Sequence, residues 1–189
     1  MTMLYAGLAL FMATHLLLSA APAAIDAQRS RLGEGPVKAL IAAPSLMGIV
    51  LIAMGWRGAE VSWVYVPPAG ARLPGLLLVA LGIYLFVVAN RPSRVKRLIR
   101  HPQLTGLVLW CAGHLLLNGD TRSLALFGSF AVWAVVEILL INRRDGHWDK
   151  PEPAPLATDL TTVAVSVVAL LGLAWAHPWL AGVAILPAP

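Results

Sequence analysis

The stretch Arg100–Asp120, RHPQLTGLVLWCAGHLLLNGD, decides the fold because it combines a membrane-compatible apolar helix with side chains that can bind a cofactor. The proline near its start suits the first turn of a helix, where its missing N–H has no helical partner. Cys111 and His114 are three residues apart, so a helix places both on one face. An ionisable side chain inside a hydrocarbon-facing helix is expensive, and His114 therefore indicates a functional site.

The composition is that of a membrane protein. The chain has 189 residues, of which 59% are hydrophobic and only 12% are charged, which is too apolar for an ordinary soluble domain. The net charge of +5 does not predict nucleic-acid binding, because the basic residues are spread over short connectors between apolar runs. The expected partner is the lipid bilayer. A single cysteine excludes an intramolecular disulfide.

Apolar runs of membrane-compatible length predict an all-α fold, an integral-membrane bundle of about six transmembrane helices. Because the connectors are short, we expect a single transmembrane domain over residues 1–189. Eleven of the fourteen Lys and Arg residues lie in the first, third and fifth connectors, which predicts these connectors in the cytoplasm and both termini outside. The runs lie at about 3–22, 37–56, 73–90, 102–118, 122–142 and 159–187.

The first run carries the next candidate ligand, His15. The run ends in small residues that resemble a signal-peptidase site, but its start has no Lys or Arg and its apolar part is long for a signal core. We therefore expect a retained helix. His15 is either hydrogen-bonded within the bundle or a cofactor ligand. We favour a ligand, since each nitrogen of a neutral imidazole in lipid needs a partner.

Two further polar residues lie near the cytoplasmic ends of predicted helices. His101 is either a solvated helix cap or a contact to a polar group of a cofactor. Glu137 lies inside its helix, where an acid should be paired or protonated. Its partner is expected to be Arg97, Arg100 or a histidine whose tautomer it fixes, and a purely structural ion pair is the alternative.

Further predictions concern the ends of the helices. Asn118 is a candidate support for the ligands, and Asn118-Gly119-Asp120 predicts a tight turn in which glycine tolerates positive φ. Asp159 is a plausible N-cap of the last helix. His177 lies between two tryptophans, which is typical of an aromatic belt at the outer membrane interface.

Two long segments resemble one known family. RHPQLTGLVLWCAGHLLLNGDTRSLALFGSF, and LFMATHLLLSA followed by RSRLGEGPVKALIAAPSLMGIVLIAMGW, resemble the NnrU family in the expected order. The resemblance implies a bacterial inner (cytoplasmic) membrane protein associated with denitrification, that is, with nitrite and nitric-oxide metabolism. The plant relative is 15-cis-zeta-carotene isomerase, which uses haem b to isomerise a cis double bond.

The resemblance also implies a ligand set. The residues proposed to serve the haem of the plant relative match here at His15 and at Cys111-x-x-His114. Imidazole and thiolate are both known axial ligands of haem iron, and two histidines from two facing helices would hold it. We therefore expect haem b between His15 and His114, with Cys111 able to replace a ligand on a redox change. The substrate would be an apolar polyene or a diatomic gas, and no catalytic residue or protein partner can be named.

Two alternatives stay open. Arg100-His101-Pro102 followed by Gly106 is similar to the RHPxYxG signature of membrane methyltransferases, which hold S-adenosylmethionine at the cytoplasmic face. Here Leu104 stands at the tyrosine position, and the paired glutamates of those enzymes are not evident. The other alternative is a non-catalytic membrane partner that assists assembly or signalling of the nitrite- and nitric-oxide-reducing systems.

Overall fold

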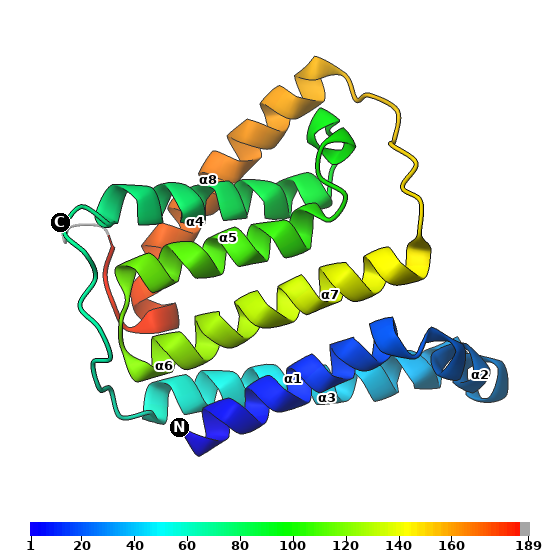
Figure 1. Cartoon of the computed structure of the whole chain (residues 1–189), viewed down its shortest axis with the longest axis horizontal. Helices are drawn as coiled ribbons and strands as arrows, with labels where there is room; N and C mark the ends of the chain where they lie inside the picture. Colours follow the sequence, from blue (N-terminus) through cyan, green and yellow to red (C-terminus); the bar gives the residue numbers. More distant parts are fainter. Residues whose placement is uncertain (186–189) are drawn as a thin grey trace. The chain divides into compact units, whose positions relative to one another are not determined.

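The computed structural model describes residues 1–185, which fold into helices joined by short connectors (Figure 1). This confirms the all-α prediction. The helices are α1 (Thr2–Ala20), α2 (Pro22–Leu32), α3 (Glu34–Gly58), α4 (Arg72–Ala89), the 3-10 helix η1 (Arg94–Arg97), α5 (Pro102–Leu117), α6 (Thr121–Ser123), the π-helix η2 (Leu124–Gly128), α7 (Ser129–Asp145) and α8 (Leu156–Ala181).

Within the described chain, five helical stretches are long and apolar enough to cross a membrane: α1, α3, α4, the continuous run α6–η2–α7, and α8. A sixth, α5, is apolar but shorter, with 16 residues. Each predicted apolar run overlaps one of these six stretches. The last run extends past the end of α8 at Ala181, and its residues 186 and 187 lie outside the described residues. The chain is therefore a multi-pass membrane protein whose apolar helices contact lipid. The expected orientation of the termini stays a prediction.

The helix α2 was not predicted, because its polar sequence carries no apolar period. Pro22 stands in its first turn, and Gly33 ends it with a φ of +84°, a conformation that favours glycine. Arg29 forms ion pairs with Asp26 at 2.9 Å and with Glu34, at the start of α3, at 3.6 Å. These contacts shape a polar hairpin between the first two apolar helices.

The described chain divides into two compact units. The first, unit 1, consists of Met1–Val66 and Asn118–Gly146, and the second, unit 2, consists of Pro67–Leu117 and the chain from His147 onward. The expectation of a single domain over the whole chain stays a prediction. Each unit is described by itself below.

In unit 1, α1 packs against α3 through glycines that bring the two backbones together (Figure 1). A Cβ on Gly55 would overlap the backbone of Leu4, and a Cβ on Gly48 would lie 3.0 Å from the backbone nitrogen of Phe11. These pairs show that α1 and α3 are antiparallel. Small residues at helix crossings are typical of membrane proteins, where close backbone approach replaces the hydrophobic driving force.

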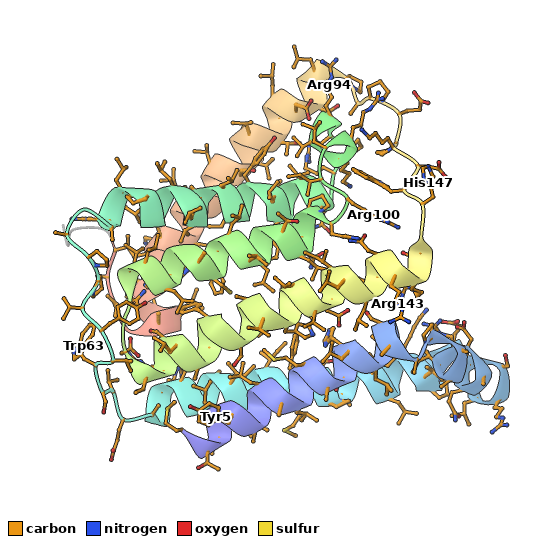
Figure 2. The ribbon with its side chains drawn as sticks, in the orientation of Figure 1. Tyr5, Trp63, Arg94, Arg100, Arg143 and His147 are labelled. Carbon is orange, nitrogen blue, oxygen red and sulfur yellow. The ribbon has the colours of Figure 1, made fainter. Side chains whose placement is uncertain are left out.

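The helix α7 runs parallel to α1 in the same unit. Leu4 and Leu8 of α1 form a buried core with Ala125 of η2, and one turn further Phe11 meets Phe130. Figure 2 shows Tyr5 and Trp63 toward one end of this unit and Arg143 toward the other. The directions of α1, α3 and α7 agree with the alternation expected for the first, second and fifth apolar runs.

In unit 2, α4 and α5 are antiparallel and meet at two glycine pairs. A Cβ on Gly82 would lie 2.7 Å from the carbonyl oxygen of Gly106, and a Cβ on Gly113 would lie 2.6 Å from that of Gly75. The pairs are spaced by seven residues on each helix, which repeats the close approach after two turns. α5 is thereby fixed against α4, with Cys111 and His114 in its second half.

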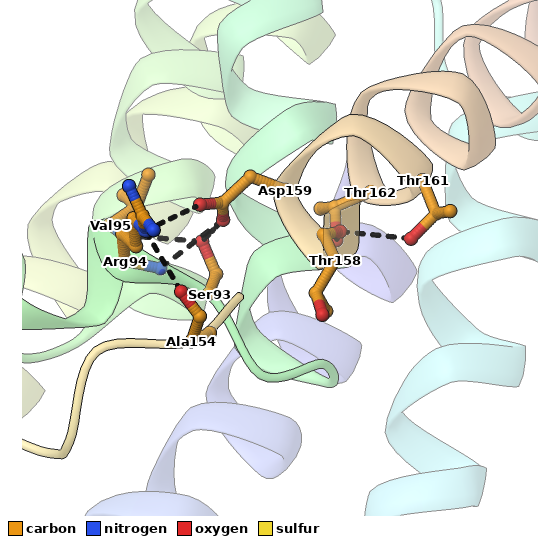
Figure 3. A network of polar contacts seen from close by, with 8 residues as sticks. All are labelled: Ser93, Arg94, Val95, Ala154, Thr158, Asp159, Thr161 and Thr162. Atoms are coloured by element: carbon orange, nitrogen blue, oxygen red, sulfur yellow. Dashed lines mark hydrogen bonds and ion pairs between the residues drawn. The ribbon is translucent and has the colours of Figure 1, made fainter. Parts of the chain in front are cut away.

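A polar network joins the end of α4 to the start of α8 (Figure 3). Ser93 donates a hydrogen bond of 2.7 Å to Asp159 and accepts one from the backbone N–H of Val95, so that it caps η1. The prediction that Asp159 is an N-cap is wrong: α8 begins at Leu156, and Asp159 lies in its first turn. Its carboxylate instead accepts from Ser93 and from the N–H of Arg94, which secures η1.

Replacing Asp159 by alanine is expected to destabilise this network by about 2 kcal/mol, because hydrogen bonds to a charged group are lost and Ser93 loses its acceptor. Hydrogen exchange of the backbone amides in η1 is expected to accelerate. The matched control is Asp149→Ala, since the Asp149 side chain is 99% exposed and contacts only the exposed ring of His147. Equal exchange in both variants would contradict this role.

The connector after α3 pairs with the chain that follows α5. The N–H groups of Val64 and Tyr65 both donate to the carbonyl of Gly119, at 2.8 and 3.1 Å, and the Tyr65 hydroxyl donates to the carbonyl of Asn118 at 3.0 Å. The expected positive φ of Gly119 is wrong, because this residue is not among the glycines with positive φ. Glycine is needed there for space, since a Cβ would overlap the carbonyl of Tyr65.

Burial raises the pKa of the Tyr65 phenol above its ordinary value of 10.0, and the negative charge of Asp120 adds to the rise. The folded state therefore holds this proton more tightly than the unfolded chain. The resulting stability is complete below pH 10 and is lost as the pH rises through the folded pKa. Difference titration of tyrosinate absorbance between the wild type and Tyr65→Phe is expected to show a Tyr65 transition above pH 10. A transition at or below pH 10 would contradict the burial of this phenol.

Candidate functional site

His15 lies on α1 in unit 1, with its ring nitrogen Nδ1 2.8 Å from the carbonyl oxygen of Phe11. A carbonyl only accepts, so Nδ1 carries the proton and donates it. In the neutral ring, Nε2 then holds the free lone pair. The imidazole also stacks on the ring of Phe11, with 4.2 Å between centroids.

Aromatic side chains of α7 complete the surroundings of His15. The ring of Trp133 meets the imidazole edge-on at 5.7 Å between centroids and meets Phe11 at 5.8 Å. Phe130 lies 5.6 Å from Phe11 and 6.1 Å from Trp133. The three aromatic rings hold the imidazole in one orientation. These rings form apolar surroundings for Nε2 of His15, the basic nitrogen of the imidazole.

Glu137 follows Trp133 by one helical turn and is only 3% exposed. It accepts a short hydrogen bond from the hydroxyl of Ser19, which follows His15 by one turn on α1. Sequence reasoning expected an arginine or a histidine as the partner and did not name Ser19. The other carboxylate oxygen, Oε1, and the indole nitrogen of Trp133 are both buried without a hydrogen-bond partner in the described chain.

An open groove of about 530 Å³ lies beside this cluster on unit 1. Its walls come from α1, η2 and α7, and Trp133 belongs both to the groove and to the ring cluster around His15. Most of the lining is apolar, so the groove suits hydrocarbon rather than an ion. The lining residues are Met12, Leu16, Leu124, Gly128, Ser129, Val132, Trp133 and Val136.

His114 in unit 2 repeats the local geometry of His15. Its Nδ1 lies 2.8 Å from the carbonyl oxygen of Trp110, four residues earlier on α5, and its ring lies 4.4 Å from the Trp110 ring. The same reasoning assigns the proton to Nδ1 and the lone pair to Nε2 in the neutral ring. An aromatic residue four positions before the histidine is thus a signal that sequence reasoning overlooked at both sites.

Cys111 lies one turn before His114 on a continuous helix, as the sequence predicted. Its side chain is completely buried. The two residues therefore share a face of α5, but the thiol points into packed protein. A role for Cys111 as a ligand needs a rearrangement of that side chain.

Comparison with protein-family models gives one result. The family described as NnrU protein matches residues 3–185, nearly the whole chain. The chain belongs to the NnrU family. No curated protein and no solved structure matches it. The expected family is therefore confirmed.

Two of the other predicted site residues of this NnrU chain lie at helix ends. His101 precedes α5, which begins at Pro102 as expected, and its carbonyl accepts from the N–H of Thr105 at 2.9 Å. Asn118 follows α5, and its carbonyl accepts from the Tyr65 hydroxyl. Their roles toward a cofactor stay predictions.

One histidine was set aside by sequence reasoning but lies near the site of unit 2. His177 of α8 is close enough to His114 for the charges of the two rings to interact. Its Nδ1 lies 2.7 Å from the carbonyl oxygen of Val183, so the lone pair of the neutral ring is again on Nε2. His177 is thus a second histidine of unit 2 with its lone pair on Nε2, and its role in binding is tested below.

The donor set suits a haem better than a bare metal ion. Within residues 1–185, no group of three or more His, Cys, Asp or Glu side chains could hold a metal ion. Haem iron needs only axial ligands from the protein, because the porphyrin supplies its other nitrogens. His15 belongs to unit 1, whereas His114 and Cys111 belong to unit 2. That His15 and His114 share one iron stays a prediction.

Proposed function

We propose that this NnrU-family membrane protein binds haem b through the imidazoles of His15 and His114. One observation carries the proposal. Each histidine donates Nδ1–H to the carbonyl of the residue four positions earlier, and its imidazole contacts the aromatic ring of that same residue. Metal-bound histidines almost always give their second N–H to such an acceptor, which fixes the tautomer and the ring orientation. Both rings are thus prepared to bind iron through Nε2.

Within this proposal, Cys111 is an exchangeable ligand. It shares a face of α5 with His114, and a thiolate is a known axial ligand. Because its side chain is buried, the thiol would reach the iron only after a rearrangement, such as one that follows a redox change. Glu137 and Asn118 would support the ligands from outside the coordination sphere, with Glu137 acting through Ser19 one turn from His15.

The proposed activity is the cis–trans isomerisation of an apolar polyene, or chemistry on a diatomic gas, in the bacterial inner membrane and linked to denitrification. Haem b held by these histidines would supply an iron that can change its redox state. This chain supplies histidine rings fixed by Phe11 and Trp110 and a dry environment of aromatic side chains around His15. Its apolar helices suit a substrate that dissolves in the bilayer.

Spectra of the full chain purified in mild detergent test the ligands. We expect the low-spin spectrum of bis-imidazole haem b in the wild type, a loss of most haem in His114→Ala and His15→Ala, and no change in His147→Ala. His147 is the matched control because its side chain is 88% exposed. His177→Ala distinguishes the ligand pairs. If it loses the haem while His15→Ala retains it, His177 rather than His15 binds the iron, and the proposed pair is wrong.

Activity is tested separately from binding. Haem-loaded protein incubated with a cis-configured carotene is expected to yield the trans product, and Cys111→Ser is expected to slow the reaction while retaining haem. If haem is bound but neither a polyene nor nitric oxide reacts, the isomerase part of the proposal fails. The protein would then be a haem-carrying partner of the denitrifying systems.

A further inference from the structure

The groove on unit 1 is flanked by an unusual piece of helix. Leu124–Gly128 form a π-helix directly before α7, and Leu124 and Gly128 both line the groove. Short π-helical segments are rare and occur frequently at functional sites. A Cβ on Gly128 would meet nothing within 4 Å, so the groove is open at this residue.

Trp133, which lines the groove, and Glu137, which does not, each carry a buried polar atom. The indole N–H of Trp133 is a donor without an acceptor, and Oε1 of Glu137 is an acceptor without a donor. Leaving such groups unpaired in a buried position is costly. They lie one turn apart on α7, a spacing that places the two side chains side by side. A single hydroxyl can accept from the first and donate to the second.

We propose that this groove binds a linear apolar molecule with a hydroxyl at one end, taken up from the bilayer. The chain of the ligand lies along Met12, Leu16, Val132 and Val136, and its hydroxyl pairs with Trp133 and Glu137. Because both polar atoms are covered, the hydroxyl reaches them when the Trp133 ring turns aside. The site lies in unit 1 alone and does not require bound haem.

The geometry favours this ligand over an ordinary phospholipid. A phospholipid head carries phosphate oxygens that only accept hydrogen bonds, so they offer no donor to Oε1 of Glu137, and the Ser19 hydroxyl is already engaged. A pure hydrocarbon would fill the groove but leave Trp133 and Glu137 unpaired. An alcohol or phenol with a long apolar tail meets both requirements.

Energy transfer from tryptophan to a fluorescent tetraene measures binding to the full chain in detergent. The probes are parinaryl alcohol and its methyl ether, which can accept but not donate a hydrogen bond. We expect the alcohol to bind about tenfold more tightly than the ether, equivalent to one hydrogen bond of about 1.4 kcal/mol. Glu137→Met keeps the volume but removes the acceptor, and is expected to abolish this preference.

Substitutions that fill the groove provide a second test of the site. Gly128→Leu is expected to weaken binding of both probes at least tenfold, whereas Gly172→Leu is the matched control, because Gly172 is also helical and also faces open space. If Gly128→Leu does not fold, Val132→Trp blocks the same groove from a side chain that is 66% exposed.

Equal affinity for the alcohol and the ether would overturn the role of Glu137 and Trp133. Unchanged binding in both Gly128→Leu and Val132→Trp would overturn the site itself. These outcomes are distinct from a failure of the proposed haem binding, which is measured by haem absorbance and not by energy transfer to the probe.

Discussion

The variant Gly55→Ala is expected to lower the free energy of unfolding by roughly 3 kcal/mol, at the upper end of the usual cost of overpacking. The added methyl group would overlap the backbone of Leu4, and backbone atoms cannot rotate away as a flexible side chain can. α1 and α3 would have to separate, which removes the close contact that holds unit 1 together. Unfolding in mixed detergent micelles, followed by circular dichroism, measures the effect.

The control for this prediction lies three residues further on the same helix. A Cβ on Gly58 would meet nothing within 4 Å. Gly58→Ala is therefore expected to be neutral or to stabilise the protein by up to about 1 kcal/mol through helix propensity. Similar destabilisation by both variants would show that close approach of α1 is not the reason for glycine at position 55.

The variant Gly119→Ala is expected to cost about 3 kcal/mol or more, because its methyl group would overlap the carbonyl of Tyr65. The connector after α3 would lift from the chain after α5, and the two hydrogen bonds to the Gly119 carbonyl would break. Hydrogen exchange of the Val64 and Tyr65 amides measures this directly. We expect their protection to be lost.

Gly35→Ala is the control for that substitution. Gly35 also lies in unit 1, and a Cβ there would meet nothing within 4 Å. The Val64 and Tyr65 amides should keep their protection in this variant. Persisting protection in Gly119→Ala would mean that the connector does not depend on the close contact.

The sequence predicted the helices well because lipid imposes one simple rule. A segment that crosses a bilayer must be long, apolar and internally hydrogen-bonded, so the apolar runs marked the six stretches directly. The helix α2 was not predicted because its sequence is polar. The π-helix η2 was not predicted, because no residue type marks the change from i→i+4 to i→i+5 backbone hydrogen bonds. Asp159 was placed at a helix end because a capping residue was assumed, whereas its actual partner lies on η1, more than sixty residues away in the chain.

The candidate site was only partly predictable. His15, Cys111, His114 and Glu137 stand out because ionisable or reactive side chains are rare in apolar helices. Their partners depend on which helices pack together, and sequence periodicity does not determine that. The pairing of Ser19 with Glu137 requires α1 and α7 to be parallel neighbours. The approach of His177 to His114 likewise requires α8 to pack within unit 2.

The local contacts of the two histidine rings could have been predicted from the sequence. Phe11 and Trp110 each stand four residues before a histidine, which on a helix places an aromatic ring and a carbonyl beside the imidazole. Repetition of this pattern in two separate helices agrees with the proposal that both rings bind haem. It does not by itself bring them together.

Haem content of the wild-type chain, purified in mild detergent after expression with ample haem supply, tests the central claim most directly. We expect equimolar haem b with the absorbance of two imidazole ligands, bound tightly enough to survive gel filtration. Purified, folded protein that lacks this absorbance and takes up no added haem would contradict it.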